Sequence, residues 1–286
     1  MNTNLRGIGF ILLSGIILAL NDAVYKSLVP HYPVGQILFI IASGVALLIW
    51  LVLGLRRGAG VRVKSWAGHI ARGLFFVVAS FAFVISLKYL TLAETICIAF
   101  SGPLFMTLLA RQFLNEQVGT VRLAAVLIGF IGVVIIIQPG TSHFRWVLLL
   151  PLLVGFGDAA RDVITRKIAP GESSLSIVFT TSFILALAGL ITYPLGWNAF
   201  QLPHLVRMLA GIFLTVAAYF YMVEAYRYSQ AVVIAPFRYI QIIWGILAGY
   251  LIWGEVPGSQ VYVGIFIIVG AGIFIAYREM WVKGST

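Results

Sequence analysis

The second half of the chain repeats the first half at an offset of 139 residues. Glu116 corresponds to Glu255 and Gly119 to Gly258, and both segments follow a largely apolar run. Each half has room for five membrane spans, and an odd number of spans reverses the second copy relative to the bilayer. Inverted repeats of this kind are typical of secondary transporters, in which two similar gates face one site near the bilayer midplane.

The composition predicts a membrane protein made almost entirely of helices. Hydrophobic residues make up 61% of the chain and charged residues only 10%, which is unlike a soluble globular domain. About 20 apolar residues cross the hydrocarbon. We expect ten spans near residues 5–28, 33–55, 69–90, 93–114, 121–139, 146–168, 173–195, 205–228, 230–253 and 258–278. The connections are too short for an extramembrane catalytic or DNA-binding domain.

The positive charges predict which ends of the spans are cytoplasmic. Of the 19 Lys and Arg residues, fourteen fall on the side of the N-terminus: Arg6, Arg56, Arg57, Arg62, Lys64, Arg72, Arg111, Arg122, Arg161, Arg166, Lys167, Arg227, Arg278 and Lys283. Four fall on the opposite side, namely Lys26, Lys88, Arg145 and Arg207, and Arg238 lies inside a span and is not counted. This bias places both termini in the cytoplasm. The net charge of +10 therefore indicates topology, and we expect no nucleic-acid partner.

Motifs for enzymatic or metal chemistry are not found in the sequence. The four His residues lie in loops or at span ends, and Cys97 is the one cysteine, so no metal-ligand spacing is present. The chain has no Gly-rich phosphate loop after a strand, no HExxH and no GxSxG. We expect no metal and no cofactor.

The opening helix of each half is interrupted by charged residues. The first helix carries Asn21, Asp22 and Lys26, and the sixth carries Asp158, Arg161 and Asp162. One interpretation is local pairing, Asp22 with Lys26 and Asp158 with Arg161, near helix ends. The other is a gate or relay for protons or substrate, because carboxylates inside a membrane are costly and tend to be functional.

A second matched pair of interruptions lies in the fourth and ninth helices. Ser101-Gly102-Pro103 lies near the middle of the fourth, and the ninth has Pro236 followed by Gly245 and Gly249. Proline removes a helical hydrogen bond and clashes with the preceding turn, so both helices should bend. The bends are either static or hinges for a moving half-helix, with Gly102, Pro103, Pro236 and Gly245 as the hinge residues.

Two further charges, Glu224 and Arg238, lie at similar depth on the cytoplasmic side of the eighth and ninth helices. Their counterparts in the first half, Ile85 and Ala99, are uncharged. The two residues form a structural ion pair, a one-sided latch, or a site in which Arg238 meets a substrate carboxylate.

The middle of the third, fourth, eighth and ninth helices is rich in rings and small polar groups. We predict that a substrate contacts Phe76, Ser80, Phe83, Phe100, Ser101, Tyr219, Met222, Tyr239, Gln241 and Trp244. Hydrocarbon cannot satisfy the polar atoms of Tyr219 and Gln241. Such a lining suits a small, partly apolar metabolite and suits a multiply charged nucleotide poorly, since that ligand needs several cations.

The chain resembles the EamA-type drug/metabolite transporters over its whole length. The resemblance is carried by LNEQVGTVRLAAVLIGFIGVVIII and WGEVPGSQVYVGIFIIVGAGIFI, which close the two halves with Leu114-Asn115-Glu116 and Trp253-Gly254-Glu255. Within that superfamily the chain is most similar to YddG-type exporters of aromatic amino acids. The resemblance implies two five-helix repeats, residues 1–140 and 141–286, in a bacterial inner membrane.

The predicted function is therefore export of aromatic or apolar amino acids, without an obligatory protein partner. A nucleotide-sugar or phosphometabolite carrier is the alternative within transporters. A remote enzyme alternative comes from Gly155-Phe-Gly157-Asp158, which has the GxGD form of intramembrane aspartyl proteases, with Asp22 as the second acid. Such a short glycine-containing string arises easily by chance.

Overall fold

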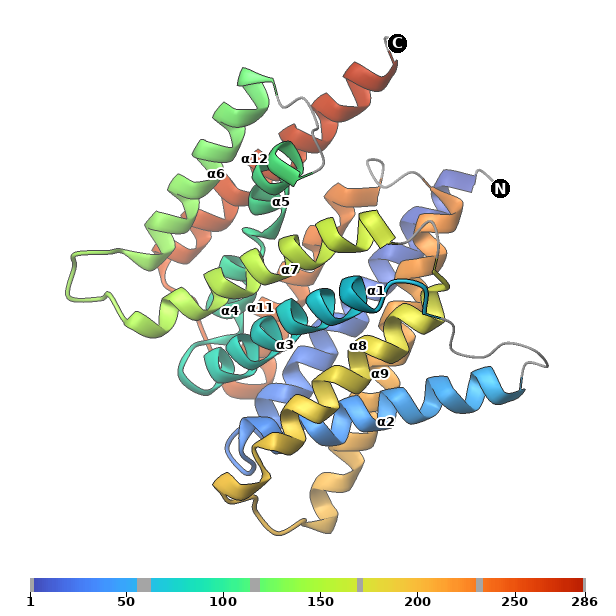
Figure 1. The fold of residues 1–286 in the computed structure, drawn as a ribbon. Coiled ribbons are helices and arrows are strands. Elements are labelled where there is room, and N and C mark those ends of the chain that lie inside the picture. Colours follow the sequence, from blue (N-terminus) through green and yellow to red (C-terminus); the bar gives the residue numbers. More distant parts are fainter. Residues whose placement is uncertain (1–2, 56–62, 114–118, 169–171, 230–233, 285–286) are drawn as a thin grey trace.

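The computed structural model describes residues 3–55, 63–113, 119–168, 172–229 and 234–284 (Figure 1). Its first half contains α1 (Thr3–Leu28), α2 (Val34–Leu55), α3 (Trp66–Tyr89), α4 (Leu92–Ala99), α5 (Gly102–Phe113) and α6 (Thr120–Ile137). Its second half contains η1 (Trp146–Leu148), α7 (Leu149–Ile168), α8 (Ser174–Ile191), η3 (Tyr193–Leu195), α9 (Leu202–Tyr228), η4 (Ala235–Tyr239), α11 (Ile240–Trp253) and α12 (Ser259–Gly284). These residues include no strand, which confirms the all-helical prediction.

Seven helical segments of the described residues are long and apolar enough to cross a membrane. Two shorter apolar helices, Phe237–Trp253 and Ser259–Ile275, accompany them. Helix α7 is apolar at its start but carries Asp158, Arg161 and Asp162 further along. It is therefore not among the segments that are apolar enough over a membrane-spanning length. The count of ten spans stays a prediction.

The helices of the two halves pack mainly against each other. α6 lies against α12, and α2 lies against α8 (Figure 1). α1 packs on α9 and α11, while its counterpart α7 packs on α3 and on α4 and α5. Each contact between the halves thus reappears when the halves are exchanged, which is the pattern that a two-fold relation between repeats produces.

The two ends of the helix bundle can be told apart in Figure 1. The start of α1 and the end of α12 lie at one end, here called the terminal end. The turns from α3 to α4 and from α6 to α7 lie at the opposite end, here called the distal end. Both names are kept below.

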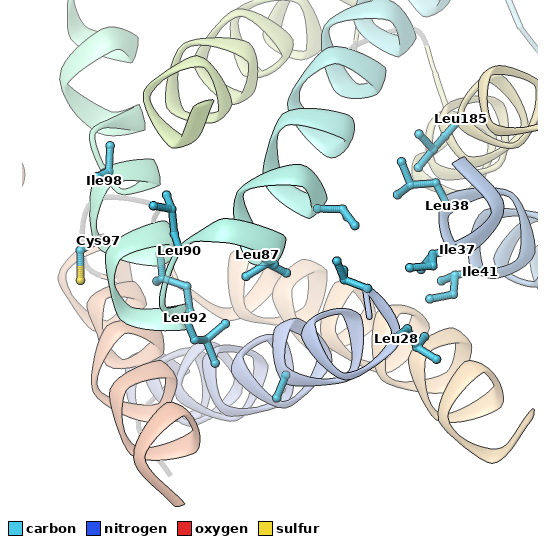
Figure 2. Close-up of a cluster of buried hydrophobic side chains, with 14 of the residues drawn as sticks. Leu28, Ile37, Leu38, Ile41, Leu87, Leu90, Leu92, Cys97, Ile98 and Leu185 are labelled. Atoms are coloured by element: carbon cyan, nitrogen blue, oxygen red, sulfur yellow. The ribbon is translucent and has the colours of Figure 1, made fainter. Parts of the chain in front are cut away.

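Apolar side chains fill the interior and also cover the outside. A buried cluster joins α1, α2, the α3–α4 turn and α8, with Leu28, Ile37, Leu92 and Leu185 among its members (Figure 2). On the outside, Phe266 is 84% exposed. An outer surface with many exposed large hydrophobic residues is costly in water and is suited to lipid.

The interruptions expected in the fourth and ninth helices are present as departures from α-helical geometry. α4 ends at Ala99 and α5 begins at Gly102. Pro103 has no N–H for the carbonyl of Ala99, so the helix cannot continue through this point. In the second half, Pro236 lies in the first turn of the 3₁₀ helix η4, which passes into α11 at Ile240. The first interruption therefore lies within a span and the second near the start of one.

The two glycines of the GxGD-like string have a packing role. A Cβ on Gly155 would lie 2.5 Å from Ser101 Oγ and 2.9 Å from the carbonyl oxygen of Ala99. A Cβ on Gly157 would lie 3.1 Å from the Cβ of Ala79. α7 thus approaches α3 and the α4–α5 break too closely for side chains. Close helix packing accounts for these glycines without protease chemistry.

Candidate substrate site

A group of charged residues on α7 forms the centre of the candidate site. Arg161 Nη1 lies 2.7 Å from Asp158 Oδ1, and Arg161 Nη2 lies 3.0 Å from Asp162 Oδ1. One guanidinium therefore pairs with both carboxylates, and the expected local pairing of Asp158 with Arg161 is confirmed. The side chains of Asp158 and Asp162 are 40% and 44% exposed, so neither is sealed off by its contact with Arg161.

Residues of other helices surround this group. The Arg161 guanidinium lies 5.4 Å from the ring centroid of Phe76 on α3, within the range of a cation–π contact. The Tyr219 hydroxyl on α9 interacts electrostatically with Arg161 and Asp158. Asp158 also interacts with Arg238 of η4. The group therefore lies where α3 of the first half meets α7, α9 and η4 of the second.

Arg72 on α3 belongs to the same group, although the charge count assigned it to a cytoplasmic helix end. Its Nε donates to Thr165 Oγ1 at 2.7 Å, and its Nη1 donates to Thr181 Oγ1. Its charge is repelled by Arg161 and attracted by Asp162 and Asp158, and it also interacts electrostatically with Tyr219. This position could have been predicted from the sequence. Arg72 precedes Phe76 by four residues, so the two side chains share one face of the helix.

A second polar group lies on α1. Gln241 Nε2 of α11 donates to Asp22 Oδ2 at 2.8 Å, and Asp22 is 6% exposed. One residue earlier, Asn21 Oδ1 accepts from Thr215 Oγ1 of α9 at 3.4 Å. Tyr25 of α1 lies near both groups, since Tyr219 and Asp22 both belong to its electrostatic surroundings.

The expected local pair of Asp22 with Lys26 is wrong. Lys26 Nζ instead donates to Glu255 Oε1 and to the carbonyl oxygen of Leu90 at 3.1 Å. Glu255 Oε2 accepts from the backbone N–H of Leu92 at 2.9 Å. These contacts tie α1, the α3–α4 turn and the α11–α12 turn together at the distal end. The local pair does not form because packing places the Glu255 carboxylate of this turn against the Lys26 ammonium.

At the terminal end, Glu172 in the α7–α8 connection caps the start of α3. Its Oε1 accepts from the backbone N–H groups of Lys64 at 2.6 Å and Ser65 at 3.0 Å. His69 Nε2 lies 3.5 Å from the same oxygen. Burial acts to raise the pKa of Glu172, but the amide donors and His69 outweigh it, so this pKa lies below its ordinary value.

The structure brings some of the other predicted contact residues together and separates others. The rings of Phe100 and Tyr239 are in contact, tilted by 40° with their centroids 5.3 Å apart. The Tyr239 hydroxyl points at Gly272 of α12, where a Cβ would collide with it. Met222 packs in a separate apolar cluster with Ile11 of α1 and Ala225 of α9. Tyr239 and Met222 are therefore both held in contacts between helices.

The remaining predicted contact residues differ in how far they are buried. Phe83 packs against Ala79, Ala82 and Val154, whereas Ser80 is half-buried on α3. Ser101 is fully buried, and its hydroxyl has no hydrogen-bond partner among the described residues. Trp244 on α11 is 36% exposed.

The last of the charged and hinge predictions lie on α9 and α11. Glu224 is half-buried on α9, and its pairing with Arg238 stays a prediction. Gly245 faces α4, since a Cβ there would lie 2.5 Å from Ile96 Cδ1. Leu114-Asn115-Glu116 lies outside the described residues.

Comparison with protein families gives one match, found in both halves. The model of the EamA-like transporter family matches residues 5–138 and 145–277. The match therefore spans nearly all of the described helices.

Three curated relatives carry substrate names. The S-adenosylmethionine uptake transporter of Rickettsia felis is 30% identical over 98% of this chain and 95% of its own. The riboflavin transporter of Vibrio cholerae is 29% identical over 96% and 94%. The pseudopaline exporter of Pseudomonas aeruginosa is 25% identical over 94% and 95%. A solved crystal structure shares the fold with a TM-score of 0.64 at 18% identity, covering 96% of this chain and 98% of its own.

Proposed function

Because the chain belongs to the EamA-like transporter family, a family of membrane carriers of small molecules rather than enzymes, we propose that its solute combines an amino-acid zwitterion with a ring. Aromatic and apolar amino acids, exported as by YddG-type proteins, are the first candidates. The Arg161 group carries the proposal. It offers a guanidinium, two partly exposed acidic side chains and the Phe76 ring in one place.

The charges of this group match a zwitterion better than a polyanion. A solute ammonium would meet the carboxylate of Asp158 or Asp162, and the ring would lie on Phe76 or Tyr219. A nucleotide sugar or phosphometabolite would have to compete with both carboxylates for Arg161, and those carboxylates would repel its phosphate groups. The phosphometabolite alternative is therefore disfavoured.

S-adenosylmethionine is a second candidate, supported by the relative that is named for its uptake. It has an amino-acid end and a purine ring, so it carries the same recognition elements. Relatives named for uptake and for export both occur. The direction of transport therefore has to be tested together with the identity of the solute.

For the topology, we propose ten spans in two inverted repeats, with both termini cytoplasmic and the protein in a bacterial inner membrane. The exchange-symmetric packing of α1 and α7 supports this arrangement. Accessibility labelling of cysteines introduced at residues 56–64 and 254–258 tests it. The two regions should react from opposite faces of the membrane, and reaction from the same face would refute the inversion.

For the mechanism, we propose alternating access with bending at the two interruptions. The bend in the first half would use Gly102 and Pro103, and that in the second half Pro236 and Gly245. The absence of continuous α-helical geometry at residues 100–101 and in η4 supports this proposal, because such points bend at low cost.

Reconstituted liposomes test the proposed function. We expect saturable flux of labelled tryptophan, phenylalanine or S-adenosylmethionine. Arg161→Gln should lower this flux at least tenfold, because the charge-assisted contacts of the guanidinium at the centre of the group are lost. Tyr219→Ala and Trp244→Ala should also lower flux in folded protein. Absence of flux for all three solutes would refute the proposal. Equal final accumulation with and without a proton gradient would remove Asp22 and Asp158 as proton carriers.

A further inference from the structure

We propose that Arg72 binds the carboxylate of the transported solute, and that this binding releases a tie between the two halves. The inference rests on the proposed function and adds a residue to it. Arg72 is held by two hydroxyl groups of the second half, Thr165 on α7 and Thr181 on α8. The guanidinium thus links α3 of the first half to two helices of the second.

Both hydroxyl groups accept from Arg72 and are uncharged. The hydrogen of each hydroxyl is already bonded within its own helix. Thr165 Oγ1 donates to the carbonyl oxygen of Arg161 at 2.7 Å, and Thr181 Oγ1 donates to that of Ile177 at 2.7 Å. Each keeps a hydrogen bond if Arg72 withdraws. An arriving carboxylate can therefore replace them without leaving a hydroxyl hydrogen unpaired.

Arg72 makes no direct ion pair with a carboxylate of the described residues, although Asp162 and Asp158 attract its charge from beyond ion-pair distance. The nearby carboxylates of Asp158 and Asp162 are both paired with Arg161. Within the described residues, no carboxylate lies within ion-pair distance of Arg72. A guanidinium has five N–H donors, and the two hydroxyls use only two of them. Bidentate pairing with a solute carboxylate would supply a direct ion-pair partner and further acceptors.

The position of Arg72 fits a solute that also uses the Arg161 group. Phe76 lies one helical turn away on the same face of α3, and Tyr219 interacts electrostatically with Arg72. A solute carboxylate at Arg72 would therefore leave its ammonium near Asp158 or Asp162 and its ring near Phe76. Because the same donors tie α3 to α7 and α8, occupancy would loosen the tie and favour relative movement of the halves.

The experiment compares solutes with and without a carboxylate. Binding to purified full-length protein is measured for two pairs: phenylalanine against phenylalaninamide, and S-adenosylmethionine against its decarboxylated form. The wild type should bind the carboxylate-bearing member of a pair about ten- to a hundredfold more tightly. Arg72→Gln should bind both members equally, and Arg72→Lys should recover part of the preference. Arg207→Gln, which removes an exposed arginine of α9, should keep the full preference.

Thr181→Val separates binding from a merely structural tie. If Arg72 binds the solute, this variant keeps the preference for the carboxylate and binds at least as tightly as the wild type. If Arg72 only holds the helices together, Thr181→Val and Arg72→Gln should weaken both members of a pair alike, and the inference is overturned. Equal binding of both members by the wild type also overturns it while leaving the proposed function intact. Binding of neither pair overturns both.

Discussion

The bridge between Lys26 and Glu255 should hold the distal end of the protein closed. It joins α1 of the first half to the α11–α12 turn of the second, and Glu255 also accepts from the first residue of α4. The bridge can act only while these segments are together. Lys26→Met should therefore favour a form in which the distal end is open.

The magnitude follows from the burial of the two side chains. Lys26 is 9% exposed and Glu255 19%, so the pair is largely removed from solvent. Removing one partner of a buried pair costs about 3–5 kcal/mol. Glu255 keeps the N–H of Leu92, so we take the lower figure, about 3 kcal/mol. A loss of that size from the closed form shifts the equilibrium toward the open form roughly 100-fold.

The one cysteine of the chain supplies the assay. Cys97 lies on α4, is fully buried, and follows Leu92 by five residues (Figure 2). Its rate of reaction with a membrane-impermeant maleimide should rise with the population of the open form. We expect faster labelling in Lys26→Met by up to about 100-fold, the factor given by the lost bridge energy.

Two further variants make the test specific. Lys88→Met removes an exposed lysine near the same end and should leave the labelling rate unchanged. Exchanging the two charges, Lys26→Glu with Glu255→Lys, should bring the rate back toward that of the wild type. If Lys26→Met labels no faster than Lys88→Met, the bridge does not hold this end closed.

Two other predictions concern stability. Gly155→Leu should destabilise the folded protein by about 1–3 kcal/mol, because its Cβ would lie 2.5 Å from Ser101 Oγ. The yield and the unfolding temperature should both fall, and an unchanged melting curve would contradict the close packing. Glu172→Gln should lower the unfolding temperature at pH 7, since the pKa of Glu172 is depressed in the folded state. That stabilisation is complete above the ordinary value of 4.5 and is lost as the pH falls through the lower folded pKa. The two melting curves should therefore converge under acid, and a constant difference would refute the capping role.

Much of the secondary structure could be read from the sequence because it depends on local properties. The apolar runs place the helices, and Pro103 ends one because it cannot donate a hydrogen bond to Ala99. The pairing of Asp158 with Arg161 was equally accessible, since residues three apart on a helix are neighbours. Each of these features is decided within a few residues of chain.

Partners across helices were not accessible in this way. Lys26 has Asp22 four residues away, yet it pairs with Glu255, which is 229 residues distant. Arg72 looked like a helix-end charge, yet it reaches Thr165 and Thr181 of the other half. A side chain inside a membrane protein binds whichever polar group the neighbouring helix presents at its depth. The sequence determined the helices and their repeat, whereas helix packing decided which of their charges meet, because that depends on helix rotation and depth.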